Sequence, residues 1–510
     1  MFGGGTLERL PYSWLRPTTR RRRDTMRPFA ARQRLLAIQR MLIDIGVFAL
    51  AAGTSLLSAL AVNKLFLHRA YELLQTPDQL AERLTELVTL GSGMLAWFVK
   101  SGHYTRRTPF WSEAHDIVVT VALMALIDCT LQYMNKDSFS RLWLLQHWIF
   151  AAALLIASRT LFKRLMLADG AWQLRTLVVG RRSDVDDVIA ALESEPALGY
   201  RVVGILDPDR GYGALGDASV SEASDGPALE WGWLSALCRR HCIENLVLAC
   251  DAAELARMHL LLRELSRHGM PHSFVPPLRG IAVHGLQIQH FMSHDVVLMQ
   301  PRNNLAQTAN RGIKRAFDVA AASAALLLLG PLMVVIATLV RRDGGPALYA
   351  HGRIGLHGRR FRCLKFRTMV SDADRVLEAH LAVSSEAAEE WARDRKLRDD
   401  PRLTPLGRFL RKNSIDELPQ LINVLKGGMS LVGPRPIVES EQAFYGDDLG
   451  YYLQVRPGIT GLWQVSGRNN VCYARRVALD GWYVRNWSLW HDIAILCGTV
   501  PAVLRREGAY

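Results

Sequence analysis

Residues 319–340 read VAAASAALLLLGPLMVVIATLV and form the longest uninterrupted apolar run of the chain. The run is long enough for a helix that crosses a bilayer, which takes about 20 apolar residues. Basic residues flank it on both sides: Arg311, Lys314 and Arg315 before it, and Arg341, Arg342 and Arg353 after it. A crossing helix normally carries its positive charge on one side. The symmetric charge therefore favours a helix that enters one leaflet and returns to the same side.

Gly330 and Pro331 lie near the middle of this run. Proline lacks a backbone donor and its ring clashes with the preceding turn, so a helix bends or breaks there. The carbonyls that lose their partners need polar groups or water nearby. We predict a linker and a re-entrant membrane helix over residues 301–342, with the break at Gly330 and Pro331. A straight crossing is the alternative.

The composition indicates a membrane protein with several domains. The 510 residues exceed the usual size of one hydrophobic core. Apolar residues make up 49% of the chain and the net charge is +14, which favours anionic partners such as phospholipids, nucleotides or nucleic acid. The sequence contains no recognisable nucleic-acid-reading motif, so we expect no nucleic-acid partner. The seven cysteines show neither paired spacing nor nearby histidine ligands, which argues against a disulfide framework or a zinc site.

Four further apolar segments lie earlier in the chain, at 41–62, 84–100, 114–134 and 143–167. Basic residues are concentrated before the first segment, between the second and the third, and after the fourth. The positive-inside rule then places the start of the chain and everything after residue 168 in the cytoplasm. We predict a basic cytoplasmic tail over residues 1–34 and a four-helix transmembrane anchor over residues 35–168.

Residues 169–300 alternate short β-rich runs with helical stretches, which is typical of an α/β domain. The run RTLVVG ends at Gly180, and the pattern resembles a Rossmann fold. Glycine is missing at the positions of Arg182 and Val185, so the turn that cradles a pyrophosphate is incomplete. We predict a Rossmann-like cytoplasmic domain here. A regulatory or dimerising role without a cofactor is favoured over dinucleotide binding.

Cationic side chains recur in short motifs through the remaining residues, 343–510. The candidates for phosphate binding are Lys365 and Arg367 in KFRTM, Arg402 in DPRLT, Arg411, Arg435 in GPRP, and Arg456 and Arg468 in VRPGITGLWQVSGRN. Arginine matches phosphate oxygens with two parallel hydrogen bonds, and lysine adds a point charge. Several such loops together would bind a pyrophosphate, whereas any single one would belong to a solvated basic face.

Asp416 and Glu417 lie between those arginines in the segment SIDELPQLINVLK. Pro419 favours the first turn of a helix, so both carboxylates are expected at a helix start. Ser414 and Glu417 also fit the spacing of a capping box. Carboxylates among anionic substrates need a cation, and Mg²⁺ held by one or two carboxylates plus substrate phosphates is the common solution. One carboxylate would then bind the metal while the other attacks phosphorus.

Residues from about 302 to 510 resemble the polyprenyl-phosphate hexose-1-phosphate transferases, monotopic enzymes that begin bacterial glycan synthesis on undecaprenyl phosphate. The shared motifs occur in family order: KRAFD, KFRTM, DPRLT, SIDELPQLINVLKG, MSLVGPRP, RPGITGLWQVSGRN and WYVRNWSLWHDI. The four-helix anchor and the α/β domain resemble those of the larger members. The resemblance implies a small, mainly helical catalytic domain over residues 343–510 at the cytoplasmic face of the bacterial inner membrane.

By this resemblance the chain transfers a sugar 1-phosphate from a UDP-sugar to the lipid phosphate and releases UMP. Asp416 would be the nucleophile, and Glu417 would hold Mg²⁺. The candidates for binding the phosphates or the nucleotide are Lys365, Arg411 and Arg435, followed by Arg456, Arg468 and Asp480. Direct attack by the lipid phosphate, with both carboxylates on the metal, is the alternative route.

The motifs near the end of the chain resemble the galactose-transferring branch, used for O-antigen, capsule or exopolysaccharide, more than the glucose-transferring branch. The expected product is undecaprenyl-diphosphate galactose, and UDP-glucose is the alternative donor. A non-catalytic membrane regulator that senses a nucleotide is an interpretation of a different class. It predicts that Asp416→Asn leaves function intact. A symmetric homodimer is compatible with either interpretation.

Overall fold

The computed structural model describes residues 29–62, 77–135, 141–207, 211–214, 221–222, 231–276, 278, 280–290, 297–394, 397, 400–466 and 472–504. Two compact units make up the chain, Met1–Pro277 and Leu278–Tyr510. The predicted basic tail lies almost entirely outside the described residues, and the candidate phosphate ligand Arg468 also lies outside them.

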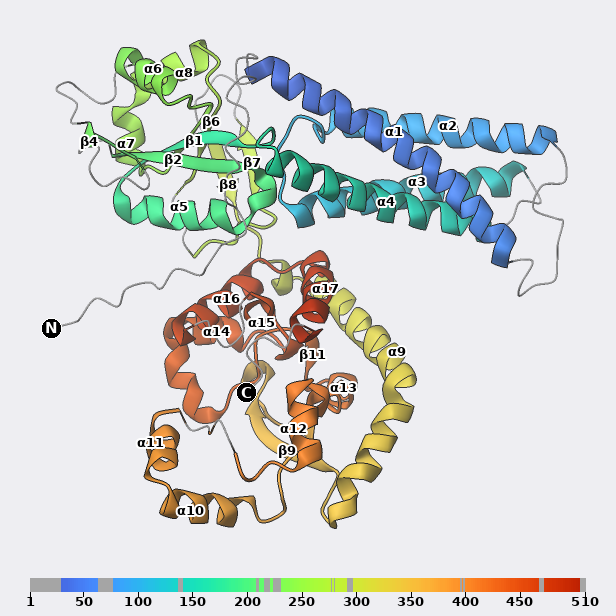
Figure 1. Ribbon diagram of the computed structural model, residues 1–510, viewed down its shortest axis with the longest axis vertical. Helices are drawn as coiled ribbons and strands as arrows, with labels where there is room; N and C mark the ends of the chain where they lie inside the picture. Colours follow the sequence, from blue (N-terminus) through green and yellow to red (C-terminus); the bar gives the residue numbers. More distant parts are fainter. Residues whose placement is uncertain are drawn as a thin grey trace. The chain divides into compact units, whose positions relative to one another are not determined.

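Four long helices begin the first unit, as the sequence predicts. They are α1 (Phe29–Val62), α2 (Pro77–Lys100), α3 (Phe110–Asn135) and α4 (Arg141–Ala168). The helices lie side by side in a bundle (Figure 1). Large side chains fill the space between them, and Phe48, Met94, Phe98 and Leu155 are all buried there. The apolar segments therefore located the C-terminal ends of these helices to within one residue.

Among the described residues, three helices are long and apolar enough to cross a membrane: Ala31–Val62, Phe110–Met134 and Thr308–Val340. α2 and α4 carry more charge, and part of it is buried in the bundle. Arg83 of α2 donates to Asp128 of α3 at 2.6 Å, and Arg159 of α4 donates to Asp44 of α1 at 2.6 Å. Paired charges of this kind lower the mean hydropathy of a helix, although the charged side chains are buried between helices and do not contact lipid. The four helices are confirmed, and four crossings stay a prediction.

A six-stranded sheet completes the first unit, in the order β4, β3, β2, β1, β5, β6. The strands are β1 (Leu174–Val179), β2 (Tyr200–Asp207), β3 (Gly211–Ala214), β4 (Ser221–Glu222), β5 (Asn245–Leu248) and β6 (His272–Phe274). The helices that accompany them are α5 (Arg182–Ser194), α6 (Trp231–Arg240), α7 (Ala252–Arg257) and α8 (His259–Arg267). β2, β1, β5 and β6 are parallel, and α5 connects β1 to β2. Parallel strands joined through a helix confirm the predicted α/β domain.

Helices predominate in the second unit, as predicted. They are α9 (Thr308–Val340), α10 (Ala373–Val383), α11 (Ser385–Asp394), α12 (Pro405–Lys412), α13 (Gln420–Leu425), α14 (Leu449–Tyr452), α15 (Leu462–Val465), α16 (Tyr473–Arg485) and α17 (Leu489–Leu504). The strands form three pairs: β7 (Gln287–His290) with β8 (Val297–Gln300), β9 (Leu348–Ile354) with β10 (Arg360–Phe366), and β11 (Ser430–Val432) with β12 (Gly458–Thr460). Only the last pair is parallel among these.

α9, which contains the long apolar run, follows one side of the second unit along a curved path (Figure 1). It continues as one helix through Gly330 and Pro331, so the helix does not end at the predicted break. Proline removes one hydrogen bond and crowds one turn, which bends a long helix more readily than it ends one.

The KRAFD motif fixes the first half of α9 to its unit. The buried Lys314 ammonium donates to the Asp492 carboxylate at 2.7 Å and to the Val432 carbonyl at 3.0 Å. The same carboxylate accepts hydrogen bonds from the Tyr483 hydroxyl at 2.7 Å and the Trp487 indole at 3.1 Å. Asp492 is fully buried, so its charge depends on these donors.

Two further charged residues of the motif extend this attachment. The Arg315 guanidinium donates to both of the last two carbonyls of α13, at 2.7 and 2.9 Å. The Asp318 carboxylate accepts from the Ser430 hydroxyl at 2.8 Å and from the Leu431 backbone N–H at 3.1 Å. α9 is therefore bonded both to the helix that follows the carboxylate pair and to strand β11.

The second half of α9 returns to the same unit. Met333, Ile336 and Val340 are buried against Phe366 of β10 and Leu410 of α12. Two ends of one helix therefore contact one folded unit.

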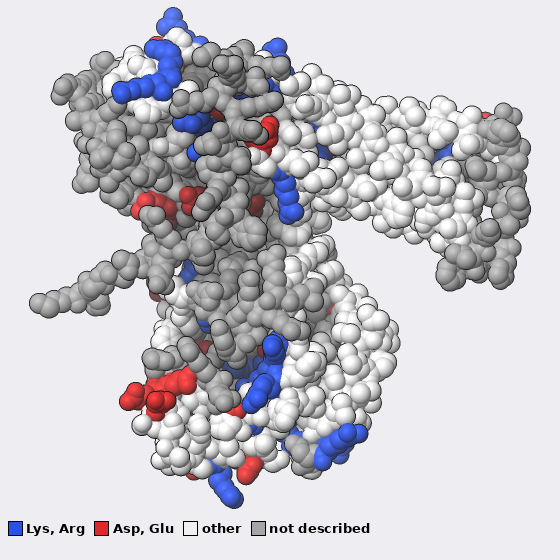
Figure 2. Space-filling view, viewed as in Figure 1, with Lys and Arg blue, Asp and Glu red and all other residues white. Residues whose placement is uncertain are grey.

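Between these contacts α9 presents apolar side chains outward. Leu327 is 83% exposed and Leu328 is 79% exposed. α9 forms one margin of the second unit. In Figure 2 this margin shows almost no charged side chains, except near the end of the helix. Exposed apolar surface of this extent marks a membrane or partner contact.

Lys314→Met should destabilise the protein, because Asp492 then stays buried without its cation. Removing one partner of a buried pair typically costs about 3–5 kcal/mol. The measurement is thermal unfolding of the purified protein in detergent. Arg311→Met, one turn earlier at an exposed position, is the matched control and should change stability by less than about 0.5 kcal/mol. Equal melting temperatures for the two variants would contradict the assignment.

Candidate active site

Asp416 and Glu417 occupy a short 3-10 turn, Ile415–Glu417, between α12 and α13. Ser414, just before the turn, has a left-handed backbone with φ 56° and makes no side-chain capping bond. The capping box that the spacing of Ser414 and Glu417 allows, the structural alternative for this segment, is therefore not formed. Glu417 is consequently not held in a capping box with Ser414.

α12 is seated on the KFRTM loop, which places Arg411 next to the turn. The Gly407 backbone approaches so closely that a Cβ atom there would lie 1.9 Å from the Thr368 carbonyl oxygen. The Thr404 backbone N–H donates to the same carbonyl at 3.1 Å. At the far end of α12, the Arg411 Nε donates to the Thr368 hydroxyl at 2.9 Å. The KFRTM loop and helix α12, which are far apart in sequence, therefore pack together beside the carboxylate pair.

Lys365 of β10 reaches Glu417 directly. Its Nζ donates to the Glu417 Oε1 at 2.6 Å, and each side chain is about one-third exposed, at 32% and 33%. A pair this exposed adds little stability. Its cation and anion are therefore available to a substrate.

A cavity of about 760 Å³ opens beside this pair, and we call it the cationic cavity. Its volume is in the range that suits a small-molecule ligand. Asp416 and Glu417 line it together with these basic residues: Arg353, Lys365, Arg367, Arg402, Arg411 and Arg435. Five of the sequence-predicted phosphate ligands therefore converge on one space with the two carboxylates.

Two of those five cations are buried and hydrogen-bonded to groups other than the carboxylate pair. Arg402 donates through Nε and Nη2 to both oxygens of Asp400, at 2.8 and 2.7 Å, and lies over the Trp391 ring. Arg367 donates to the Val340 carbonyl at 2.9 Å and to the Ser371 hydroxyl at 3.1 Å. Both are largely buried, so they shape the wall more than they offer free donors.

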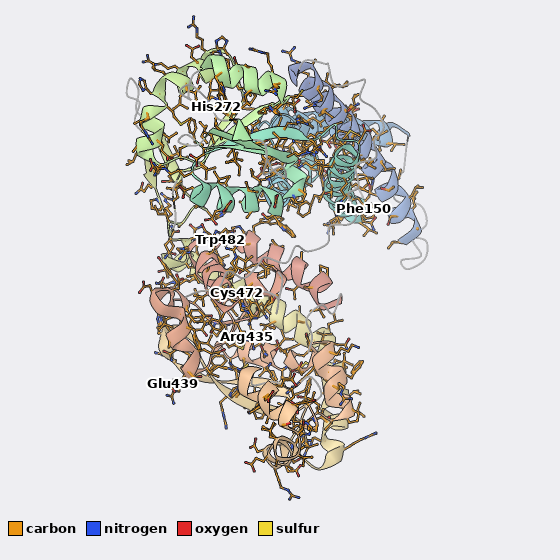
Figure 3. All side chains as sticks on the ribbon, turned by 60° about the vertical axis from the view of Figure 1, so that its left-hand side comes forward. Phe150, His272, Arg435, Glu439, Cys472 and Trp482 are labelled. Atoms are coloured by element: carbon orange, nitrogen blue, oxygen red, sulfur yellow. The ribbon has the colours of Figure 1, made fainter. Side chains whose placement is uncertain are left out.

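Arg435 follows β11 in the GPRP loop and is exposed to the cavity. It lies toward the middle of the second unit, whereas Glu439 a few residues later lies at the margin (Figure 3). Asp480 is buried away from the cavity lining and accepts from the Tyr445 hydroxyl at 2.9 Å. Burial raises the pKa of Asp480 to about 7, opposed by the hydrogen bonds from Tyr445 and the Arg435 backbone. Asp480 therefore positions the Arg435 loop.

The remaining predicted ligand among the described residues is Arg456. Its Nε donates to the Gly427 carbonyl at 2.9 Å, and it is absent from the lining of the cationic cavity. Arg456 therefore supports the turn after α13.

Asp416 is 8% exposed, and its burial raises the pKa of the carboxyl from 3.8 to about 6. Lys365 and Arg411 oppose the rise, whereas the charge of Glu417 adds to it. A carboxylate with a raised pKa and few solvating partners is a better nucleophile than an exposed one.

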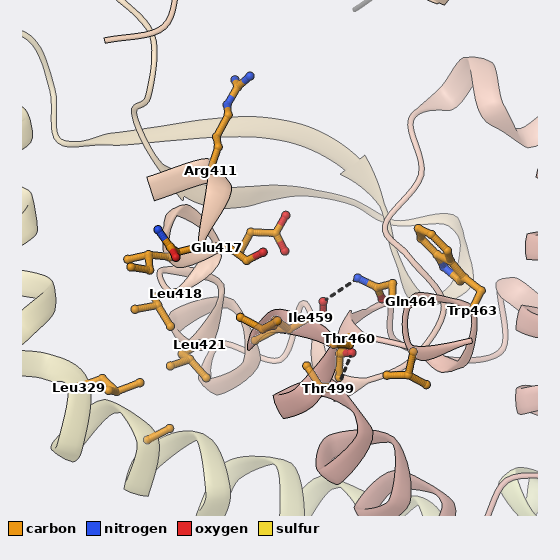
Figure 4. A pocket seen from close by; sticks show the side chains of 17 residues that line it. Leu329, Arg411, Glu417, Leu418, Leu421, Ile459, Thr460, Trp463, Gln464 and Thr499 are labelled. Atoms are coloured by element: carbon orange, nitrogen blue, oxygen red, sulfur yellow. Dashed lines mark hydrogen bonds between the residues drawn. The ribbon is translucent and has the colours of Figure 1, made fainter. Parts of the chain in front are cut away.

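A second cavity, of about 480 Å³, lies beside the same turn, and we call it the apolar cavity. Arg411, Ser414 and Glu417 line both cavities. Figure 4 shows Arg411 and Glu417 at one end of the apolar cavity and Leu329 of α9 at the other.

The described residues include no group of three or more His, Cys, Asp or Glu side chains able to hold a metal ion. Asp416 and Glu417 offer two carboxylates at most, so further ligands would come from substrate or water. That ligand set is the usual one for Mg²⁺, so the residues fit the ion and the magnesium site stays a prediction.

Several cavity residues were missed as site residues. Tyr349, His351 and Arg353 of β9 and Cys363 of β10 line the cationic cavity. The signal was a period of two: alternate residues of a strand share one face, and LYAHGRI places an aromatic, a histidine and an arginine on that face.

Comparison with known proteins adds to this geometry. Residues 309–506 match the family model for bacterial sugar transferases, and residues 100–276 match that for a CoA-binding domain. A Salmonella typhimurium protein named undecaprenyl-phosphate galactose phosphotransferase is 43% identical over 435 residues, which cover 85% of this chain and 90% of that protein. The chain belongs to the bacterial sugar transferase family. It is accordingly an enzyme.

Two further relatives are similar to this transferase over different shares of its length. An Erwinia amylovora protein named UDP-galactose-lipid carrier transferase is 39% identical, with 82% of this chain and 86% of that protein covered. A Rhizobium meliloti protein named exopolysaccharide production protein ExoY is 54% identical over 198 residues, which are 39% of this chain and 88% of that protein. The match to the shorter relative therefore covers less than half of this chain but most of that protein.

Asp416→Asn should stabilise the protein at alkaline pH. The folded state binds the Asp416 proton more tightly than the unfolded state, so ionisation costs stability as pH rises from 3.8 through about 6. Above that range the cost is roughly 1–3 kcal/mol, and asparagine removes it. We expect the melting temperature of the variant to exceed that of the wild type at about pH 8 and to match it at about pH 4. The exposed Asp447→Asn is the control, and the same gain from it would refute the argument.

Gly407→Ala should displace α12, because its Cβ would overlap the Thr368 carbonyl. Overpacking of this kind costs about 1–3 kcal/mol. Gly450→Ala, where a Cβ meets nothing within 4 Å, is the control. Thermal unfolding measures both, and an unchanged Gly407→Ala variant would show that α12 is not seated as described.

Proposed function

We propose that this transferase moves galactose 1-phosphate from UDP-galactose to undecaprenyl phosphate. The products are UMP and undecaprenyl-diphosphate galactose, the starting unit of an O-antigen, capsule or exopolysaccharide. The observation that carries the proposal is the Asp416 and Glu417 pair inside the cationic cavity, on a unit bonded to an exposed apolar helix. The reaction requires binding of an anionic donor, binding of an anionic acceptor, and contact with a bilayer. The basic side chains of the cationic cavity suit the two anions, and the exposed apolar side chains of α9 suit the bilayer.

The first step uses Asp416 as the nucleophile. Its carboxylate oxygen bonds to the phosphorus that carries the sugar, and the bond from that phosphorus to the UMP oxygen breaks. UMP leaves with the electron pair, and an acyl phosphate remains on Asp416. The raised pKa keeps this carboxylate reactive in the range where it is ionised, above about 6.

The second step regenerates Asp416. An oxygen of the lipid phosphate bonds to the same phosphorus, and the bond to the aspartyl oxygen breaks. The product is a lipid diphosphate sugar, and two anionic substrates never meet at full charge. Direct attack by the lipid phosphate remains the alternative route and predicts sequential rather than ping-pong kinetics.

Three cations would bind the diphosphate. Lys365 and Arg411 flank the carboxylate pair, and Arg435 reaches the cavity from the GPRP loop. Charge-assisted hydrogen bonds from such donors become stronger as charge develops on the leaving phosphate. Glu417 would hold Mg²⁺ with substrate phosphate oxygens, where the ion would supply charge neutralisation.

The proposed setting is the bacterial inner membrane, with both units' soluble parts in the cytoplasm. α1 to α4 would cross the bilayer, in line with the alternation of basic residues. α9 would enter and leave one leaflet, because both of its ends contact the same unit while Leu327 and Leu328 are exposed. A homodimer remains part of the proposal, and its support is the symmetry common among such assemblies.

Galactose is proposed as the sugar because two relatives over 80% of the chain carry galactose in their names. Among the described residues that line the cationic cavity, none distinguishes the sugar's C4 hydroxyl by its chemistry alone. UDP-glucose is therefore the alternative donor.

The test is UMP release and lipid-extractable label from radiolabelled UDP-galactose and UDP-glucose, with purified protein, Mg²⁺ and undecaprenyl phosphate. We expect label from UDP-galactose, and Asp416→Asn should lower it about a thousandfold or more. Asp447→Asn should retain full activity, since that residue is exposed and outside the cavity lining.

A non-catalytic regulator would yield no UMP with either sugar, and Asp416→Asn would then leave nucleotide binding unchanged. Label from UDP-glucose alone would retain the reaction and change the donor.

A further inference from the structure

The apolar cavity has a chemistry distinct from that of the cationic cavity. Its described lining is mostly aliphatic and aromatic, contributed by α9, α13, α15 and α17. Ala325 and Leu329 lie one turn apart on α9, and Ala502 and Val503 lie on the facing part of α17. Two of its walls are therefore helices whose composition suits a bilayer, since α9 and α17 are the apolar helices of the second unit among the described residues.

One end of this cavity is polar (Figure 4). Arg411 and Glu417 belong to its lining as well as to that of the cationic cavity. A molecule that extends from α9 to that end would have an apolar body along Leu329 and an anionic head beside the Arg411 guanidinium. An amphipathic lipid phosphate has this form, and a nucleotide does not.

Size and position restrict what part of such a lipid fits. A volume of about 480 Å³ is that of a small-molecule site, so it accommodates only the portion of a long isoprenoid nearest its phosphate. The rest of the isoprenoid would lie in the bilayer, along the exposed apolar residues Leu327 and Leu328 of α9.

We propose that the apolar cavity is the seat of the acceptor, holding the phosphate-proximal isoprenoid of the lipid while the nucleotide sugar occupies the cationic cavity. The inference rests on the proposed function and deepens it by assigning the apolar part of the acceptor and the nucleotide sugar to different cavities beside the Asp416 and Glu417 turn. After UMP has left through the cationic cavity, the lipid phosphate attacks the same phosphorus from the side that UMP vacated, opposite the Asp416 oxygen.

The two halves of the reaction can be measured separately. Exchange of radiolabelled UMP into UDP-galactose, without lipid, reports the first half alone. Transfer of label to undecaprenyl phosphate reports both halves. Ala502→Trp fills the apolar cavity from α17, and Leu329→Trp fills it from α9. We expect each to lower kcat/KM for undecaprenyl phosphate about tenfold or more while UMP exchange stays within about twofold of the wild type.

Val500→Trp is the matched control, because Val500 is 60% exposed on the same helix and absent from the cavity lining. It should leave both measurements unchanged. Retained exchange also shows that the tryptophan variants are folded. Full transfer by both cavity variants, or equal loss of exchange and transfer, would overturn the assignment. A wild type with neither exchange nor lipid product would instead contradict the proposed function, and this inference with it.

Discussion

The buried Asp492 carboxylate is the contact on which the second unit depends. It accepts hydrogen bonds from Lys314 of α9, Tyr483 of α16 and Trp487, and it lies on α17. A fully buried carboxylate is tolerated only with such donors, so the helices that supply them cannot separate without exposing an unpaired charge. The apolar helix is thereby held to the domain that carries the chemistry. Arg315, next along α9, extends the attachment to α13 and so to the turn with both carboxylates.

The sequence could predict that the two candidate carboxylates lie among basic side chains, because adjacent carboxylates of this kind are chemically conspicuous. Adjacent carboxylates among arginines have few structural explanations, and the structure places Asp416 and Glu417 in one cavity with Lys365, Arg411 and Arg435. The sequence could not show which basic side chains are open to a ligand and which are bonded to other protein groups. Arg402 bonds to an aspartate two residues earlier, a pairing that depends on side-chain conformation and not on residue type.

The fold was predictable where burial follows a simple period. The helices of the bundle and the strand β1 were located from apolar runs, whereas the number of crossings was not settled because α2 and α4 conceal charges in buried pairs. Asp480, one of the weaker candidate ligands, is buried and accepts a hydrogen bond from Tyr445, and no pattern in the sequence indicates this contact between residues 35 apart. The spacing of Ser414 and Glu417 allowed a capping box, and the left-handed backbone of Ser414, which the sequence does not show, accompanies its absence.

The bond between Lys365 and Glu417 has a consequence for the resting enzyme. Each group neutralises the other, so the pair presents little net charge to a lone ion of either sign. A phosphate that competes for the lysine releases the carboxylate at the same moment, which makes the two charges available together. Such an arrangement binds an isolated divalent cation or an isolated anion weakly. It binds a complex of the cation with the anion more strongly, because both charges of the protein pair are then used. The pair would then stay closed in the presence of free ions and orthophosphate, and open to a complex of a diphosphate with its cation.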